Sequence, residues 1–247
     1  MTDFVKTSGN NHILELILNR QEKKNALTQD MYLSLAENIE KANNDDEVRV
    51  ILIRAEGESF CAGNDLNDFV KDTNLDDAAP VVRFLLALAN NNKPLVAAIQ
   101  GSAVGIGTTL LLHCDLVYAR DDTRFCLPFV HLGACVEGGG SRLLPALCGY
   151  QKAAELLLLG ERFDVQEAKS FGLVTRIIEQ QSAENAAREA CEKISRLPPD
   201  AVQTTRRLMK EHDRPAVLST IQRELTEFQR LLQTEDSKQR LAAVLKR

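Results

Sequence analysis

The chain has 247 residues, a formal net charge of −5, 44% hydrophobic residues and no Trp. This length is sufficient to bury a sizeable core, and the apolar fraction is ordinary for a globular protein. The acidic balance and the scarcity of aromatic residues argue against nucleic-acid binding through a general basic field or a base-stacking surface. We therefore expect no nucleic-acid partner.

The cysteines and the chain ends point to a cytoplasmic protein. No Cys-x-x-Cys or His-x-x-x-His pair occurs, so we expect no metal site. Residues 1–9 lack the apolar segment of a signal peptide, and no apolar run is long enough to span a bilayer, so we expect no membrane partner. Six cysteines without short paired spacing are typical of reduced thiols: Cys61, Cys114, Cys126, Cys135, Cys148 and Cys191.

The first part of the chain predicts a strand, a helix and a second strand. Residues 12–18 alternate as a strand does, and Thr28 is a good N-cap for an amphipathic helix that runs to about Asn43. The apolar run 48–53, rich in Val, Ile and Leu, predicts a buried strand.

A glycine turn, residues 59–66, follows that strand. Gly63 can take a positive φ, and Asn64 and Asp65 are residue types that start helices, so a helix is expected from Leu66. Such a turn directs unpaired N–H groups at one place, where negative charge is favoured. The spacing leaves two interpretations open, a well-capped turn or an anion or oxyanion site.

The same strand, glycine turn and helix recur after an acid-rich segment (68–77), expected to be a solvated loop, and a helix (81–89). The second unit consists of a strand at 94–99, a turn at 101–107 and a helix at 108–113. Two such units could direct N–H groups at one atom.

Three nucleotide-binding or hydrolase motifs are excluded because each lacks residues that the motif requires. Leu110 stands where a dinucleotide-binding loop needs its third glycine. Residues 138–141 lack the Gly-Lys-Ser/Thr ending of a phosphate loop, and Ser141 lacks the glycine that a serine-hydrolase elbow needs two residues later.

Helices dominate the second half of the chain. About three amphipathic helices are expected in 200–247, and their apolar stripes indicate packing on another subunit or back over the core. Alternating strands and helices followed by helices alone argue for an α/β core with a helical appendage. The elements expected before the appendage are strands at 116–119 and 173–178, and helices at 143–148, 151–159, 165–170 and 183–196.

Glu137 stands between the apolar residues 134–136 and three glycines that open a helix. Apolar neighbours would raise the pKa of its carboxyl group, whereas helix N–H groups would lower it. Its position alone fits both a catalytic carboxylate and a first-turn helix charge.

Five motifs together resemble the enoyl-CoA hydratase/isomerase (crotonase) superfamily over nearly the whole chain. They are Asn19-Arg20-x-x-Lys23-Lys24-Asn25-Ala26-Leu27, the run 60–66, Gly101-x-Ala103-x-Gly105, the run 114–119 and Ala168-x-x-x-Gly172-Leu173-Val174. Membership does not by itself fix the reaction.

The resemblance implies a crotonase-like spiral of ββα units at 1–195, which binds acyl-CoA, and a C-terminal helical trimerisation region at 196–247. A homotrimer or a dimer of trimers is therefore expected. No separate cofactor is expected, because coenzyme A enters as part of the thioester substrate.

The resemblance also implies where the substrate lies. The backbone N–H groups of Asn64 and Ile106 would form the oxyanion hole for the thioester carbonyl. The residues implied to line the substrate and coenzyme A site are Lys23, Lys24, Ala26, Ala62, Gly63, Asp65, Leu66, Gly105 and Phe129.

The catalytic acids select among the reactions of the family. Thr109 and Phe129 occupy the two positions where family hydratases carry glutamates, and neither side chain can do the acid–base work of hydration. Glu137 is instead similar to the glutamate of the peroxisomal-type 3-enoyl-CoA to 2-enoyl-CoA isomerases. We expect an enoyl-CoA isomerase with one proton-shuttling glutamate. The alternatives are hydratase or other crotonase-fold chemistry that uses Glu137 alone, and a non-catalytic acyl-CoA-binding subunit.

Overall fold

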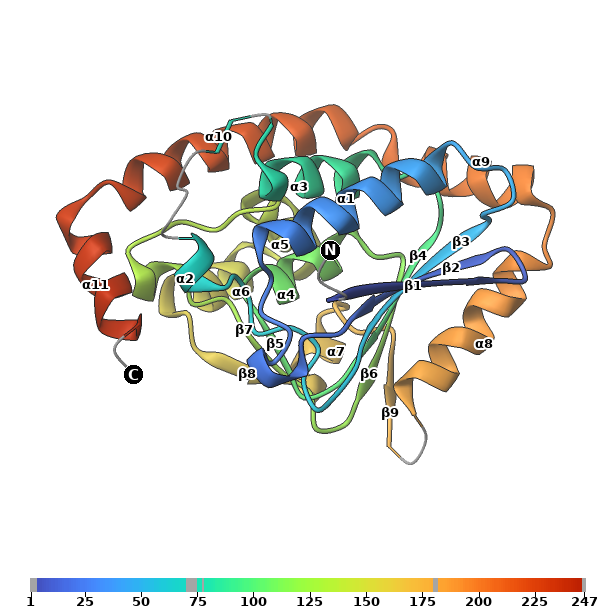
Figure 1. Ribbon diagram of the computed structural model, residues 1–247, viewed down its shortest axis with the longest axis horizontal. Coiled ribbons are helices and arrows are strands. Elements are labelled where there is room, and N and C mark those ends of the chain that lie inside the picture. The colour runs from blue at the N-terminus through green and yellow to red at the C-terminus, as the bar shows by residue number, and fades with distance from the viewer. Residues whose placement is uncertain (1–3, 70–74, 77, 180–181, 246–247) are drawn as a thin grey trace.

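The computed structural model describes residues 4–69, 75–76, 78–179 and 182–245, so most of the acid-rich segment 68–77 lies outside the described residues. Figure 1 shows a twisted sheet at the centre, with α8 against one side and α1, α3 and α10 stacked on the other. The fold is a mixed α/β fold, as the alternating pattern of the sequence predicts.

Two sheets form the β structure. The larger sheet has the order β1-β2-β3-β4-β6-β9, in which only β1 and β2 pair antiparallel. Its strands are β1 (Val5–Asn10), β2 (Ile13–Leu18), β3 (Val50–Ala55), β4 (Leu95–Ile99), β6 (Leu116–Arg120) and β9 (Arg176–Ile178). The smaller sheet comprises β5 (Ser102–Val104), β7 (Arg124–Cys126) and β8 (Arg162–Asp164).

The helices occupy most of the positions that the hydrophobic spacing predicts. Thr28 caps α1 as expected, since its hydroxyl accepts the N–H of Met31 at 3.3 Å. The helices are α1 (Gln29–Asn43), α2 (Leu66–Phe69), α3 (Pro80–Asn90), α4 (Ile106–Thr109), α5 (Gly140–Cys148), α6 (Tyr150–Ala154), α7 (Val165–Ser170), α8 (Ala183–Ser195), α9 (Pro199–Lys210), α10 (Arg214–Leu232) and α11 (Glu235–Leu245). A 3₁₀ helix at Leu110–His113 prolongs α4, and a π turn at Glu155–Leu159 prolongs α6.

The central strands are buried on both faces because successive side chains point to opposite sides. Val50 and Leu52 of β3 pack in a cluster with α8, whereas Ile51 and Ile53 pack with α1 and α3. This explains why residues 50–53, within the strand predicted at 48–53, are continuously apolar.

The elements predicted at 173–178 and 108–113 differ from those in the structure. The strand predicted at 173–178 forms only at its end, because the N–H of Leu173 donates to the carbonyl of Ala168 at 3.0 Å and continues the turn after α7. The helix predicted at 108–113 begins earlier, at Ile106, and tightens to 3₁₀ at Leu110.

The C-terminal helix α10 folds back over the core of the same chain. It lies over α3 in Figure 1, and its buried stripe joins the main hydrophobic cluster through Val217, Ile221, Leu225, Phe228 and Leu232. Of the two alternatives that the sequence leaves open, packing on another subunit or back over the core, the stripe of α10 takes the packing over the core. No helix within the described residues combines the length and apolarity needed to cross a bilayer.

Candidate active site

The two glycine turns lie side by side. Cys61 forms an isolated parallel bridge with Ala103, and the N–H of Val104 donates to the carbonyl of Cys61 at 2.9 Å. Gly63 has φ +97°, the left-handed conformation that the sequence predicts for this position.

Glycine is needed where each turn touches the other. A Cβ added to Gly63 would lie 3.1 Å from the carbonyl oxygen of Val104. A Cβ added to Gly107 would lie 2.7 Å from the carbonyl oxygen of Cys61, closer than such atoms approach in proteins. The two turns therefore interlock through their main chains.

The backbone N–H groups of Asn64 and Ile106 find no acceptor among the described residues. Both residues line one cavity of about 490 Å³. Unpaired donors at a cavity wall are the arrangement that an oxyanion hole requires.

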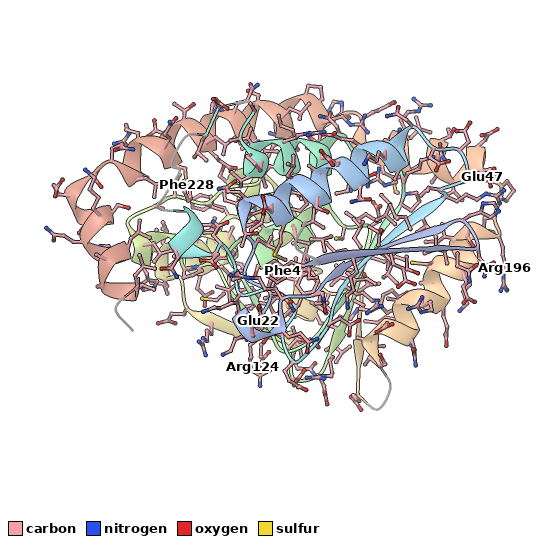
Figure 2. The ribbon with its side chains drawn as sticks, in the orientation of Figure 1. Phe4, Glu22, Glu47, Arg124, Arg196 and Phe228 are labelled. Atoms are coloured by element: carbon pink, nitrogen blue, oxygen red, sulfur yellow. The ribbon has the colours of Figure 1, made fainter. Side chains whose placement is uncertain are left out.

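The cavity wall is mainly apolar and closes toward the C-terminal helices. Phe129 and Phe228 meet edge to face on it, with ring centroids 6.5 Å apart. Figure 2 labels Phe228 beneath α10, at the end of the molecule away from Glu47 and Arg196. Of the residues expected at the substrate site, Ala62, Gly63, Leu66, Gly105 and Phe129 line this cavity.

Glu137 is buried, with 5% of its surface exposed. The hydroxyl of Thr109 donates to its Oε1 at 2.6 Å, while its Oε2 is buried without a hydrogen-bond partner among the described residues. Burial raises the pKa of Glu137 to about 8, against the opposing effect of the Thr109 hydrogen bond and with a smaller contribution from the charge of Glu224. The carboxylate is not part of the cavity wall, although Ala134, three residues earlier, is.

The alternative role of Glu137 as a first-turn helix charge is not what the structure shows. Helix α5 begins after Glu137, with Gly139 as its N-cap. The N–H groups of Gly139 and Ser141 donate to Glu224 of α10 at 2.6 and 2.8 Å. The carboxylate of Glu137 instead accepts a hydrogen bond from the Thr109 hydroxyl.

The segment expected to carry coenzyme A lies beside the first glycine turn. The N–H of Ala62 donates to the carbonyl of Lys24 at 3.0 Å, and the N–H of Leu27 donates to the carbonyl of Gly63 at 2.8 Å. Lys23 and Lys24 are exposed to solvent.

Lys23, Lys24, Ala26 and Asp65 are not part of the cavity wall. Ala26 and Asp65 are both held by Arg20. The Arg20 guanidinium donates to the carbonyl of Ala26 at 2.9 Å and pairs with Asp65 at 2.7 Å.

Two supporting residues were not identified from the sequence. The side chain of Asn25 is fully buried and donates to the carbonyls of Glu56 and Ser59, which fixes the lysine loop against the first turn. The Tyr32 hydroxyl donates a short hydrogen bond to the side chain of Asn64. Tyr32 lies in the apolar stripe of α1, so only its hydroxyl, which needs a partner when buried, signals this role.

Comparison with known proteins identifies the family of the chain. A sequence model described as enoyl-CoA hydratase/isomerase matches residues 8–247. The chain is 34% identical to the rat enoyl-CoA delta isomerase 2, over 87% of this chain and 56% of that protein. It is 32% identical to the 2,3-dehydroadipyl-CoA hydratase of Escherichia coli, over 97% of this chain and 94% of that protein.

Comparison with a solved structure shows the same fold. The chain superimposes on Pseudomonas aeruginosa OdaA with a TM-score of 0.97 and 39% identity, covering 100% of both chains. The protein belongs to the enoyl-CoA hydratase/isomerase family, whose named relatives include both isomerases and hydratases.

Proposed function

We propose that the protein is an enoyl-CoA isomerase that moves the double bond of a 3-enoyl-CoA to the 2-enoyl position. The observation that carries the proposal is the buried Glu137 carboxylate with one unpaired oxygen. Thr109 and Phe129 stand where a hydratase of this family would carry its two glutamates, so Glu137 is the acid–base group left for the reaction.

The proposed reaction needs a single carboxylate. Glu137 takes a proton from the carbon next to the thioester carbonyl, and the electron pair moves into a dienolate. The same carboxyl group then returns the proton two carbons further along, which leaves the double bond conjugated with the carbonyl. A base with a pKa near the working pH is suited to both transfers, and the pKa of Glu137 is about 8.

The oxyanion donors stabilise the charge that develops on the thioester oxygen. Because that oxygen is negative only in the transition state and the dienolate, fixed N–H groups of Asn64 and Ile106 accelerate the reaction selectively. Loss of one such donor typically costs about 100- to 1000-fold in rate. Phe129 and Ile106 line the cavity as apolar groups and favour a site from which water is excluded.

The remaining family features are part of the same proposal. The coenzyme A moiety would follow Lys23, Lys24 and Ala26, where exposed lysines offer local positive charge to its phosphates. Assembly as a trimer would cover the apolar side chains that α9 leaves exposed, among them Leu208 and Met209 at 61% and 68%. The ββα spiral and a cytoplasmic location complete the proposed description.

Substitution of Glu137 by Gln tests the proposal. We expect Glu137→Gln to lose at least about 100-fold in kcat on a 3-enoyl-CoA, because one positioned base contributes roughly 100- to 10,000-fold. Binding of the thioester should persist, which titration calorimetry with a 2-enoyl-CoA can measure. Glu227→Gln is the matched control, since Glu227 is exposed and pairs only with Arg230 among the described residues. Undiminished turnover by Glu137→Gln would overturn the assignment.

The stability of the same variant gives a measurement that needs no substrate. The pKa of Glu137 is about 8 in the folded protein and near 4.5 when unfolded, so between these values the folded state binds the additional proton. The wild type should therefore lose stability as pH rises from about 5 to about 8. Glu137→Gln has no carboxyl group at this position and should not lose stability in this way. The thermal midpoint of the variant minus that of the wild type should therefore be larger at pH 9 than at pH 5. An equal difference at both pH values would contradict the raised pKa.

Hydration remains the second candidate, and the E. coli hydratase relative is the observation that favours it. Hydration of crotonyl-CoA at a rate comparable to isomerisation would support it. Thioester binding without turnover of either substrate would instead point to a non-catalytic acyl-CoA-binding subunit.

A further inference from the structure

The turn that carries Glu137 has an unusual backbone. Gly138 and Gly139 both have positive φ, at +71° and +78°, directly before α5. Gly139, in the left-handed conformation, is followed by the helical Gly140, and a pair of opposite hand gathers its N–H groups into a concave site that favours an anion. Because α5 starts there, its helix dipole adds to this preference.

A second buried glutamate supplies the anion. Glu224 projects from α10 and has 6% of its surface exposed. Its two carboxylate oxygens accept the N–H groups of Gly139 and Ser141 at 2.6 and 2.8 Å. This contact joins two segments more than 80 residues apart along the chain.

Glu137 would be the natural alternative occupant. It precedes Gly139 by two residues, and a carboxylate near the start of a helix commonly accepts its free N–H groups. With Glu224 in place those donors are taken, and Glu137 keeps one hydrogen bond from Thr109 and one unpaired oxygen.

A histidine holds the same turn through a different group. The ring Nε2 of His113 lies 2.7 Å from the carbonyl oxygen of Gly138, to which it donates. Burial lowers the pKa of His113 to about 4, so the ring is neutral at neutral pH. The turn is thus fixed through its carbonyl by His113 and through its N–H groups by Glu224.

We propose that Glu224 is a positioning residue for Glu137. By occupying the N–H groups at the start of α5, it keeps the Glu137 carboxylate away from them and directed toward Thr109. The inference rests on the proposed function in so far as Glu137 is the base of the reaction. The contacts of Glu224 themselves are independent of the reaction.

The pKa values of both carboxyl groups are raised. The negative charge of Glu224 raises the pKa of Glu137, and burial raises the pKa of Glu224 against hydrogen bonds from Ser141 and Gly139. The other charged or titratable groups that face this pair are Tyr32 and Cys61 near Glu137, Cys135 and Arg223 near Glu224, and His113 beside the turn.

The first test is Glu224→Gln, which keeps the shape of the side chain but removes its charge and one acceptor. Once the N–H groups are partly released, Glu137 can bind them and its ionised form is favoured. We expect kcat on a 3-enoyl-CoA to fall about 10- to 100-fold, as misplacement of a catalytic group does. The acid limb of the pH–rate profile should move to lower pH. Glu227→Gln, on the same helix but exposed, should change neither.

A purely structural role gives a different result. If Glu224→Gln lowers the thermal midpoint while kcat and the acid limb match those of Glu227→Gln, the proposal is overturned. Should the Gln variant fail to fold, Glu224→Asp takes its place, since the shorter side chain keeps the charge but cannot hold both N–H groups in the same way. It should lose kcat with a smaller movement of the acid limb, and wild-type kcat in that variant would also refute the proposal.

A titration without substrate separates this inference from the proposed function. In protein carrying ¹³C-labelled glutamate, the Glu137 carboxyl signal is identified by its absence from Glu137→Gln and should titrate near pH 8 in the wild type. In Glu224→Gln it should titrate at lower pH. An unmoved signal overturns the positioning role even if isomerase activity is found. A signal that moves in both Glu224→Gln and the charge-retaining Glu224→Asp supports that role even if 3-enoyl-CoA is not turned over. A signal that moves in Glu224→Gln but not in Glu224→Asp would trace the change to the lost charge alone and would also overturn the role.

Discussion

The two glycine turns around the cavity differ in the groups that support them. The first turn is held by side chains from elsewhere in the chain, with the Tyr32 hydroxyl on Asn64 and the Arg20 guanidinium on Asp65. The second turn is held through main-chain groups: the Thr108 hydroxyl donates to the carbonyl of Ala103 at 2.7 Å, and the N–H of Gly105 donates to the carbonyl of Cys126 in β7 at 2.9 Å. A side-chain substitution far away in sequence can therefore perturb the first donor, whereas the second depends on main-chain bonds within its own turn and to β7.

The second turn has an additional connection to Glu137. It continues into Thr109, whose hydroxyl binds Glu137, so one short segment supports both the proposed oxyanion donor of Ile106 and the proposed base. The first turn supports a donor alone. Substitutions that disturb only one of the two functions should show this difference.

The largest expected effect comes from Gly107→Ala, which separates the two turns. The added Cβ would meet the carbonyl oxygen and Cβ of Cys61 at 2.7 and 2.8 Å, so one turn must move and its donor with it. We expect kcat/KM to fall by about 100- to 1000-fold, the typical cost of one oxyanion donor. Gly9→Ala is the control, because the Cβ that it adds has no described atom within 4 Å other than those of Gly9 and its two chain neighbours. Full activity of a folded Gly107→Ala protein would show that close contact of the turns is dispensable.

A smaller effect, confined to pH dependence, should follow from Thr109→Val. The Thr109 hydroxyl donates to Glu137 and lowers its pKa against burial, so removing the hydroxyl raises that pKa above about 8. Less of the base is then ionised at pH 7, and kcat/KM there should fall about tenfold, in line with one hydrogen bond to a charged group. The acid limb should move to higher pH. Thr108→Val should weaken the fold without moving that limb, because the Thr108 hydroxyl binds main-chain carbonyls instead.

Much of the fold could be predicted from the sequence because its signals are local. Apolar runs at 48–53 and 94–99 and the capped helix from Thr28 follow from spacing alone, and the structure confirms them. The three-stranded sheet was not predicted, since strands such as Arg124–Cys126 are only three residues long and are defined by their distant partners. The exposed strand Val5–Asn10 likewise lacks a buried face to reveal it.

The site divides in the same way. Gly63 and the unpaired donors of Asn64 and Ile106 follow from turn chemistry and family motifs, because those features lie within short stretches of sequence. The environment of Glu137 could not be predicted, because it depends on Glu224. Glu224 lies in a helix whose sequence pattern shows an apolar stripe but not the contact of this carboxylate with Gly139 and Ser141. Spacing shows which residues neighbour one another along a helix, but not which carboxylate reaches a distant helix start.

The smallest expected effect is that of Tyr32→Phe, which tests whether the first turn depends on its side-chain support. The change deletes one hydroxyl from a fully buried ring and leaves the side-chain oxygen of Asn64 without that donor. We expect the free energy of unfolding to drop by about 1 kcal/mol and kcat/KM by about fivefold, the usual effect of one neutral hydrogen bond. The acid limb should stay in place, because Glu137 keeps its bond to Thr109. Tyr118→Phe, in the core cluster on the α8 side of the sheet, should leave kcat/KM unchanged. Equal kinetics in the two variants would mean that the main chain alone holds the Asn64 donor, as it does the donor of Ile106.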